Sequence, residues 1–308
     1  MSAEQLAYNA FLVGFVFTAI ATVCYAALPL WPRVVYRTAA TEPSGTMTVA
    51  SGTQPPAWLG PAASAALWLA VAALTLSLGA RWVAAGRPPY ANMWEFTIGF
   101  GWGILLWYGL FEWRLHQQRD ASSNGRVVGV FVLPIALTMF AASLAFFPSE
   151  LYPLMPALQA NRILGAHVAT MMLSYAALSV SFGAAVVYLL QGEAKQPRFS
   201  RLPSGPVLEE IANRSVLVGF PMLALGIALG AYWGNMAWGR YWGWDAKETS
   251  ALVTWLIYAG YLHARNLRGW RGNRAAWVLV VGFAAVLFTY FVVNLVPWIP
   301  GLHTYAGV

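Results

Sequence analysis

Charged residues are scarce in this chain of 308 residues: only 9% are Asp, Glu, Lys or Arg, while 59% are hydrophobic. Soluble domains usually carry about a quarter charged residues, so this composition excludes an ordinary soluble protein. Long uncharged runs of this kind are typical of helices that span a bilayer. The net charge of +7 therefore does not indicate a nucleic-acid partner, because membrane proteins use excess Lys and Arg to set their orientation.

Cysteine is almost absent, since Cys24 is the single one in the sequence. One cysteine excludes an internal disulfide, and it also excludes the paired cysteines to which a haem is covalently attached. We interpret Cys24 as a small, buried apolar residue. The first ten residues contain no Lys or Arg, so we expect no cleaved signal peptide.

Eight apolar runs predict an all-α integral membrane protein with about eight transmembrane helices. Each run is long enough to cross about 30 Å of hydrocarbon as a helix. We expect residues 1–61 to form the first helix and a flexible cytoplasmic loop, because 38–61 is rich in Ser, Thr, Gly and Pro. Residues 62–308 would form one transmembrane domain. The runs are 7–28, 62–85, 94–112, 127–147, 163–190, 216–234, 247–264 and 275–296.

The distribution of Lys and Arg predicts the orientation of these helices. With eight spans, both termini lie on one side of the membrane, and the loops opposite them hold thirteen of the 18 Lys and Arg residues. Cytoplasmic loops carry the excess of positive charge. We therefore expect both termini, and the segment 233–248 between spans six and seven, on the extracytoplasmic side.

Large aromatic side chains crowd the segment 233–248. An aromatic belt at the membrane interface is one interpretation, because Trp and Tyr favour that depth. A flat platform for a large planar ligand is the other, because glycines between the indoles let a ligand approach the backbone closely. The residues concerned are Trp233, Trp238, Gly239, Trp242, Gly243 and Trp244.

Charged residues at the end of this segment have a structural interpretation and a functional one. Asp245, three residues before Glu248 at the start of an apolar run, resembles a capping box, and we expect Asp245 to cap the seventh helix. The cap would also fix the platform relative to that helix. Arg240 projects from the same loop, where it could pair with Asp245 or receive a ligand carboxylate.

Three histidines are candidate metal ligands. His167, near the start of span five, and His303, beyond the last span, are both expected outside, which suggests a bis-imidazole metal centre. Each histidine alone is more often a hydrogen-bonded structural residue. His263 lies 18 residues after Asp245, about 27 Å along a helix, and so near the cytoplasmic end of span seven. An ionisable residue there is a functional candidate, and snorkelling beside Arg265 is the alternative.

Four stretches of the sequence resemble a known family. WGRYWGWDAKETSALVTWLIYAGYLHAR (238–265) resembles the tryptophan-rich WWD signature of haem-handling proteins. RPPYANMWEFTIGFGW (87–102), LGAHVATMMLSYA (164–176) and VLFTYFVVNLVPWIPGLHTYA (286–306) are similar to the CcsA/ResC family of cytochrome c maturation system II. The resemblance covers about residues 60–308.

This resemblance implies a cytochrome c biogenesis protein. It would bind haem b as cargo, move it to the outer side of a bacterial plasma membrane or thylakoid-type membrane, and present it to the CxxCH motif of apocytochrome c. Expected partners are CcsB/ResB, with which it would form a synthase and without which it would be inactive, and a thioredoxin-like thiol reductant. His167 and His303 match the external haem ligands, and His263 matches the intramembrane one. The residues that match the family's platform motif are Trp238, Gly239, Trp242, Gly243, Trp244, Asp245 and Glu248. We expect Trp233 and Arg240, from the same segment, to contact the haem as well.

Three other functions remain open at this point. The related CcmC and CcmF proteins share a WWD stretch, although here the motif continues as AKETSAL and LHAR. A membrane electron carrier would hold permanent b-type haems between paired histidines on facing helices. A solute transporter would use the aromatic segment as a gate, and it would purify without a haem absorption band.

Overall fold

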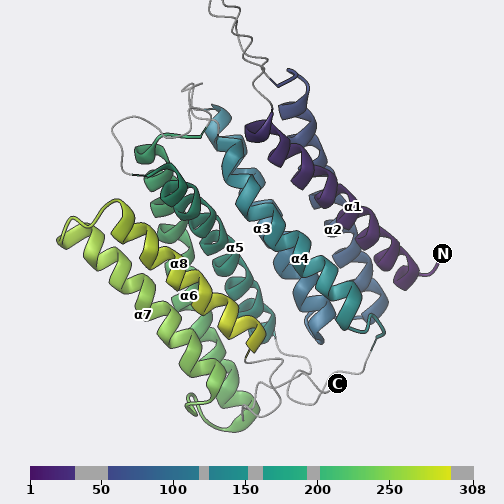
Figure 1. Cartoon of the computed structure of the whole chain (residues 1–308). Helices are drawn as coiled ribbons and strands as arrows, with labels where there is room; N and C mark the ends of the chain where they lie inside the picture. The colour runs from purple at the N-terminus through teal and green to yellow at the C-terminus, as the bar shows by residue number, and fades with distance from the viewer. Residues whose placement is uncertain (32–54, 118–124, 152–161, 193–201, 293–308) are drawn as a thin grey trace, which may run out of the picture.

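The computed structural model describes residues 1–31, 55–117, 125–151, 162–192 and 202–292 (Figure 1). Every regular element within these ranges is a helix. Most of the connection expected to be flexible, 38–61, lies outside them. The helices are α1 (Ala3–Leu30), α2 (Leu59–Ala85), α3 (Met93–Gln117), the 3-10 turn η1 (Gly125–Val128), α4 (Gly129–Phe146), α5 (Arg162–Gln191), α6 (Gly205–Trp238), α7 (Ala246–Leu267), α8 (Asn273–Leu287) and the short π-helix η3 (Phe288–Val292).

The prediction of an all-α membrane protein is confirmed. Within the described residues, six helices are long and apolar enough to cross a membrane: α1, α2, α5, α6, η1 with α4, and α8 with its π-helical end. The two remaining helices, α3 and α7, run alongside the others (Figure 1). Both carry charged residues near their ends, Glu95 and Glu112 in α3 and Glu248 and Arg265 in α7, which shortens their apolar stretches.

Successive helices alternate in direction through the bundle. The N-terminus, the 86–92 connection and the α6–α7 connection therefore lie at one end, which is the lower end in Figure 1. The starts of α5 and α7 lie at this end too. Because His167 is in the second turn of α5, the fold brings it to the same end as the aromatic segment. His263 is near the last turn of α7, toward the upper end.

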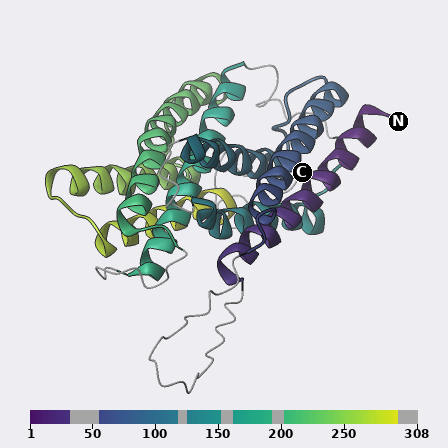
Figure 2. The ribbon, with the colours of Figure 1, turned by 90° about the horizontal axis from the view of Figure 1, so that it is seen from above.

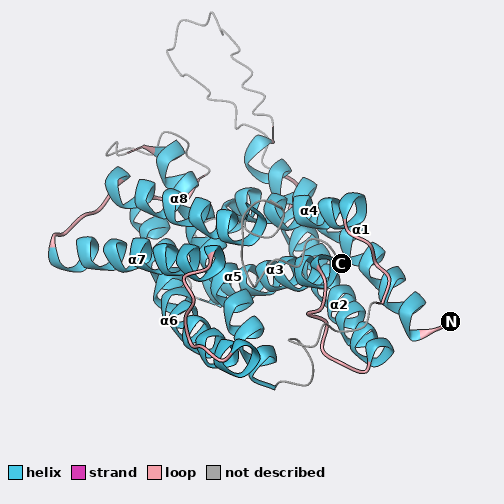
Figure 3. Cartoon of the chain, turned by 90° about the horizontal axis from the view of Figure 1, so that it is seen from below, coloured by secondary structure: helices cyan, strands magenta, loops and turns pink. Residues whose placement is uncertain are grey.

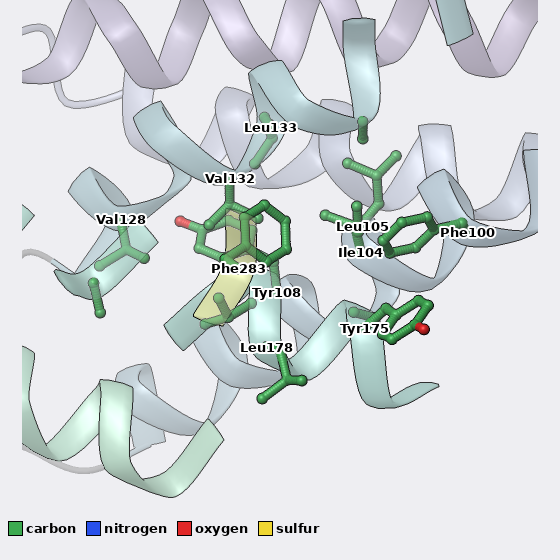
Figure 4. Close-up of a cluster of buried hydrophobic side chains, with 14 of the residues drawn as sticks. Phe100, Ile104, Leu105, Tyr108, Val128, Val132, Leu133, Tyr175, Leu178 and Phe283 are labelled. Carbon is green, nitrogen blue, oxygen red and sulfur yellow. The ribbon is translucent and has the colours of Figure 1, made fainter. Parts of the chain in front are cut away.

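Seen along the bundle, α3 and α5 lie in the middle, with α1, α2 and α4 on one side and α6, α7 and α8 on the other (Figures 2 and 3). The core joins side chains of α3, α4, α5 and α8, such as Tyr108, Val132, Tyr175 and Phe283 (Figure 4). Since lipid tails are as apolar as these side chains, close packing of helices replaces the hydrophobic effect as the main attraction between them.

Two buried ionic clusters stabilise the half of the bundle that contains α1 to α4. At the lower end, the Glu95 carboxylate accepts hydrogen bonds from Arg81 Nε and Arg87 Nη1, both at 2.9 Å. At the upper end, Glu112 accepts a hydrogen bond from Arg126 Nε at 3.2 Å and another from the Tyr25 hydroxyl. Each carboxylate is almost fully buried and fully engaged, as a charge in an apolar bundle must be.

Candidate functional site

The connection between α6 and α7 is held in one defined backbone conformation. Helix α6 ends at Gly239, whose φ of 74° is left-handed and whose N–H donates to the Asn235 carbonyl at 3.0 Å. Glycine adopts this conformation without strain. Trp244 has a φ of 57°, the one positive φ of a non-glycine residue in the described chain. Such a conformation costs roughly 1–3 kcal/mol and persists only where neighbouring contacts enforce it.

The contacts that enforce this conformation come from the predicted capping box, which is confirmed. Asp245 Oδ1 accepts a hydrogen bond from the Glu248 N–H at 2.8 Å, and Glu248 Oε2 accepts one from the Asp245 N–H at 3.2 Å. The same Glu248 oxygen also accepts from the Gly243 N–H at 2.7 Å. One carboxylate thus holds both sides of Trp244 and fixes the loop to the first turn of α7.

The four tryptophans do not form one flat platform. Trp233 is only 2% exposed and packs with Tyr90 and Leu164, while Trp244 is 69% exposed. The rings of Trp233 and Trp238 are inclined by 71°, and those of Trp242 and Trp244 by 86°. Trp233 therefore supports the segment from beneath, because α6 turns it into the space between α3 and α5. Burial raises the pKa of the Tyr90 phenol beside it.

Arg240 folds back over its own loop. A Cβ atom at Gly243 would lie 2.7 Å from Arg240 Cζ, so only a glycine at 243 leaves room for the guanidinium there. The Arg240 side chain remains exposed. A guanidinium in this position can receive a carboxylate of a ligand that lies on the loop.

His167 is held by the glycines of α6. Its Nδ1 donates to the Gly226 carbonyl at 2.7 Å. A Cβ atom at Gly230, one turn further along α6, would lie 2.7 Å from His167 Cε1. A carbonyl can only accept, so this bond places a proton on Nδ1, and in the neutral ring Nε2 is then the accepting nitrogen. That tautomer is the one in which a histidine ligates a metal, with its other nitrogen fixed by a backbone carbonyl.

The imidazole and the aromatic loop meet at two small cavities. One, of about 60 Å³, is lined by His167, Trp242, Lys247 and Glu248. The other, of about 90 Å³, is lined by His167, Trp233 and Lys247 together with further residues of α3, α5 and η3. Pockets for cofactor-sized ligands are about 300–1,000 Å³, so neither cavity encloses a macrocycle as it stands. A large planar ligand would lie across the exposed side of the loop, with His167 at its edge.

The sequence patterns missed some residues that the structure adds to this site. Lys247 lies inside the conspicuous aromatic stretch and lines both cavities. Gly226 and Gly230, four residues apart on α6, set the position of the imidazole. A signal existed for the glycines, since small residues at helical spacing often mark a close helix contact.

The structure describes one of the other two candidate histidines, His263, but not His303. His303 lies outside the described residues. His263 is exposed on α7, on a face formed with Val253, Leu256, Gly260 and Leu267, all exposed and spaced three or four residues apart. Apart from His263 this face is apolar. Within the described ranges, no group of three or more His, Cys, Asp or Glu side chains could hold a metal ion.

Comparisons with known proteins show which family the chain resembles. Residues 90–303 match the sequence profile of a family described as "Cytochrome C assembly protein". The chain is 35% identical to cytochrome c biogenesis protein CcsA of Guillardia theta, over 77% of this chain and 83% of that protein. It is 36% identical to CcsA of Microcystis aeruginosa, over 77% and 84% of the two chains. The solved structure of a cytochrome c haem lyase, CcmF, matches with a TM-score of 0.66 at 17% identity and shares the fold, with 94% of this chain covering 47% of CcmF.

Proposed function

Because the chain belongs to the cytochrome c assembly protein family, with CcsA proteins among its relatives, we propose that it binds haem b as cargo and presents it to apocytochrome c. A role in cytochrome c maturation follows from the family itself. The observation that carries the proposal further is the convergence of α5 and the α6–α7 connection. An imidazole with its Nδ1 fixed by Gly226 lies beside a loop of exposed indoles that a capping box holds in place.

The residues at this end suit haem as a substrate. The exposed Trp244 and the half-buried Trp242 offer apolar ring faces to the macrocycle. Arg240 is placed to receive a haem carboxylate. His167 would supply one axial imidazole through Nε2, and His303 would supply the other. Glu248 and Asp245 act through the loop, which they hold in the conformation that presents the indoles.

His263 would hold haem earlier on its path. It lies toward the opposite end of the bundle from Trp244, on an apolar and exposed face of α7. An ionisable side chain on such a face is costly unless a partner covers it. A CcsB/ResB protein docked against α7 would cover it and supply the second imidazole. On this account the cytoplasmic side lies at the His263 end, and the aromatic segment and both termini are extracytoplasmic.

The reaction served is thioether formation at the two haem vinyl groups. Each thiol of the CxxCH acceptor adds across one vinyl C=C bond, the sulfur bonding to one carbon and a proton going to the other, with no leaving group. This chain has only Cys24, which lies in α1, so the thiols come from the acceptor, kept reduced by a thioredoxin-like partner. The chain contributes orientation and effective concentration, as one component of a synthase.

The visible spectrum of the chain purified with its CcsB/ResB partner tests this proposal. The wild type should show a Soret band, and His167→Ala or His303→Ala should weaken the band and lower the yield of cytochrome c. Millimolar imidazole should restore part of both, because it replaces the lost ligand from solution. His116→Ala is the control, since His116 is in the last turn of α3 at the far end of the bundle.

Two results would contradict the proposal. If imidazole restored neither the band nor the yield, His167 and His303 would not act as ligands. If the haem stayed bound and cycled between redox states without ever reaching a co-expressed apocytochrome, the chain would be an electron carrier.

A further inference from the structure

A cavity much larger than the two beside His167 borders another side of α5. It is a groove of about 960 Å³ between α2, α3 and α5. Its walls are almost wholly apolar, with Trp82 and Leu78 from α2, Trp102 from α3, and Met172 and Leu173 from α5. Glycines widen it: at Gly79, a Cβ atom would meet no other heavy atom within 4 Å.

The groove has the depth of one leaflet of a bilayer. Its mouth is at the lower end of the bundle, where α2 ends, α5 begins and the 86–92 connection passes. Its deepest lining residues, Thr75 and Gly103, lie ten residues from the ends of α2 and α3, about 15 Å along a helix. The hydrocarbon core of a bilayer is about 30 Å thick, so the groove spans half of it.

At the inner end of the groove, the polar groups of Trp102 and Thr75 are paired with each other. Trp102 Nε1 donates to Thr75 Oγ1 at 2.9 Å, across the space between α3 and α2. Both residues line the groove, yet this bond satisfies the indole N–H there. The deep part therefore accepts hydrocarbon and offers little to a polar ligand.

The mouth of the groove is positively charged. Arg162, the first residue of α5, is exposed, and no carboxylate of a described residue lies within 4.0 Å of its guanidinium. Arg87 also lines the mouth, and its pairing with Glu95 fixes its position. Glu95 pairs with both Arg87 and Arg81, and Arg81 also lies 4.0 Å from the Glu4 carboxylate, so Arg162 supplies the charge that no described carboxylate pairs with. Guanidinium groups bind phosphate through paired hydrogen bonds.

We infer that this groove is a binding site for an anionic glycerophospholipid of the leaflet at the aromatic end. The phosphate lies at Arg162 and Arg87, and an acyl chain runs inward past Gly79 to the Trp102–Thr75 bond. The groove matches this class of ligand in three respects: it carries charge at one end only, its walls are apolar, and its depth is that of one leaflet. The groove borders the face of α5 next to the one that lines the His167 cavities, and Val168 and Met172 line both the groove and the cavity of about 90 Å³, so haem and lipid are measured separately.

The test measures phospholipid retained by the purified complex of the full chain with its partner. The complex is reconstituted into nanodiscs with equal amounts of phosphatidylglycerol and phosphatidylcholine, extracted in mild detergent, and analysed by native mass spectrometry. We expect retained phosphatidylglycerol in the wild type and at least a fivefold loss in Gly79→Leu, which fills the groove. Arg162→Gln should keep a lipid but lose the preference for phosphatidylglycerol.

Two control variants match these changes. Ala72→Leu adds the same side chain at an exposed position of α2 outside the groove, and Arg274→Gln removes an exposed arginine at the other end of the bundle. Both should retain lipid as the wild type does. The inference is overturned if the wild type retains no phospholipid or if groove and control variants retain it equally. It is also overturned if Gly79→Leu instead abolishes a Soret band, because haem would then be the occupant.

Discussion

Two neighbouring faces of α5, which meet at Val168 and Met172, border cavities of different character. On one face, His167 and Met171 meet the glycines of α6 around cavities of about 60 and 90 Å³ that also contain Lys247. On the other face, Gly165 and Ala169 border an open groove of about 960 Å³ with apolar walls. The first face fixes the direction of one imidazole, whereas the second leaves room for a ligand and has few polar groups to orient it. We therefore expect ligation of a haem iron, which needs a correctly directed imidazole, on the face toward α6. We expect binding of an amphiphile on the face toward α2 and α3.

The largest effect is expected where the α6 face is most tightly packed. In Gly230→Ala, the new Cβ would lie 2.7 Å from His167 Cε1 and displace the ring from the Gly226 carbonyl. Loss of such a supporting bond to a ligand typically costs about 10–100-fold in affinity or activity. We expect a loss of that size in haem affinity and cytochrome c yield, measured by Soret titration and haem staining.

Gly230→Ala also separates function from stability. Alanine is favoured over glycine within a helix by about 1 kcal/mol, and the imidazole can move at the end of its side chain. The variant should therefore fold normally. Gly79→Ala is the matched control, because this helical glycine lies on α2, away from His167 and His263, and a Cβ atom there meets nothing within 4 Å. If both variants kept wild-type haem affinity, the α6 glycines would not position His167.

Features that depend on residues close together in the sequence can be predicted from it, whereas features that depend on contacts between distant segments cannot. The helices and the Asp245–Glu248 cap were predictable, because apolar runs and a three-residue pattern are local signals. The burial of Trp233 was not, since it depends on Tyr90 and Leu164 from other segments. A flat platform was a natural expectation for four indoles in one stretch, and tertiary packing overrides it.

The same argument applies to the cavities. The direction of the His167 ring is set by glycines of the next helix, and those glycines are separated from it by the whole of the α5–α6 connection. The groove needs three helices at once, and no single stretch of sequence carries its pattern. In the sequence, each of these residues has the pattern of an ordinary lipid-facing position, and the groove exists only where α2, α3 and α5 pack together.

A smaller effect is expected from the cap that holds the aromatic loop. Asp245→Ala removes the side chain that accepts from the Glu248 N–H at 2.8 Å. Loss of an N-cap costs about 1 kcal/mol, which is about fivefold in haem affinity if the whole penalty falls on the bound loop. Asp245→Asn preserves the cap and should lose less than about twofold. Haem titration of the purified complex compares them; equal losses in both variants would mean that the carboxylate charge, rather than the cap, is required.

The smallest effect is expected on the groove face of α5, where it tests whether the two faces are separate sites. Ala169 is exposed and lines the groove, one turn from Gly165 and two residues from His167. Ala169→Leu adds bulk to the open groove and leaves the α6 face untouched. Haem affinity and cytochrome c yield should stay within about twofold of wild type, because exposed substitutions away from special contacts usually change stability by less than about 0.5 kcal/mol. A loss as large as that of Gly230→Ala would join the groove and the histidine cavities into one haem site, and the division of labour between the faces of α5 would be wrong.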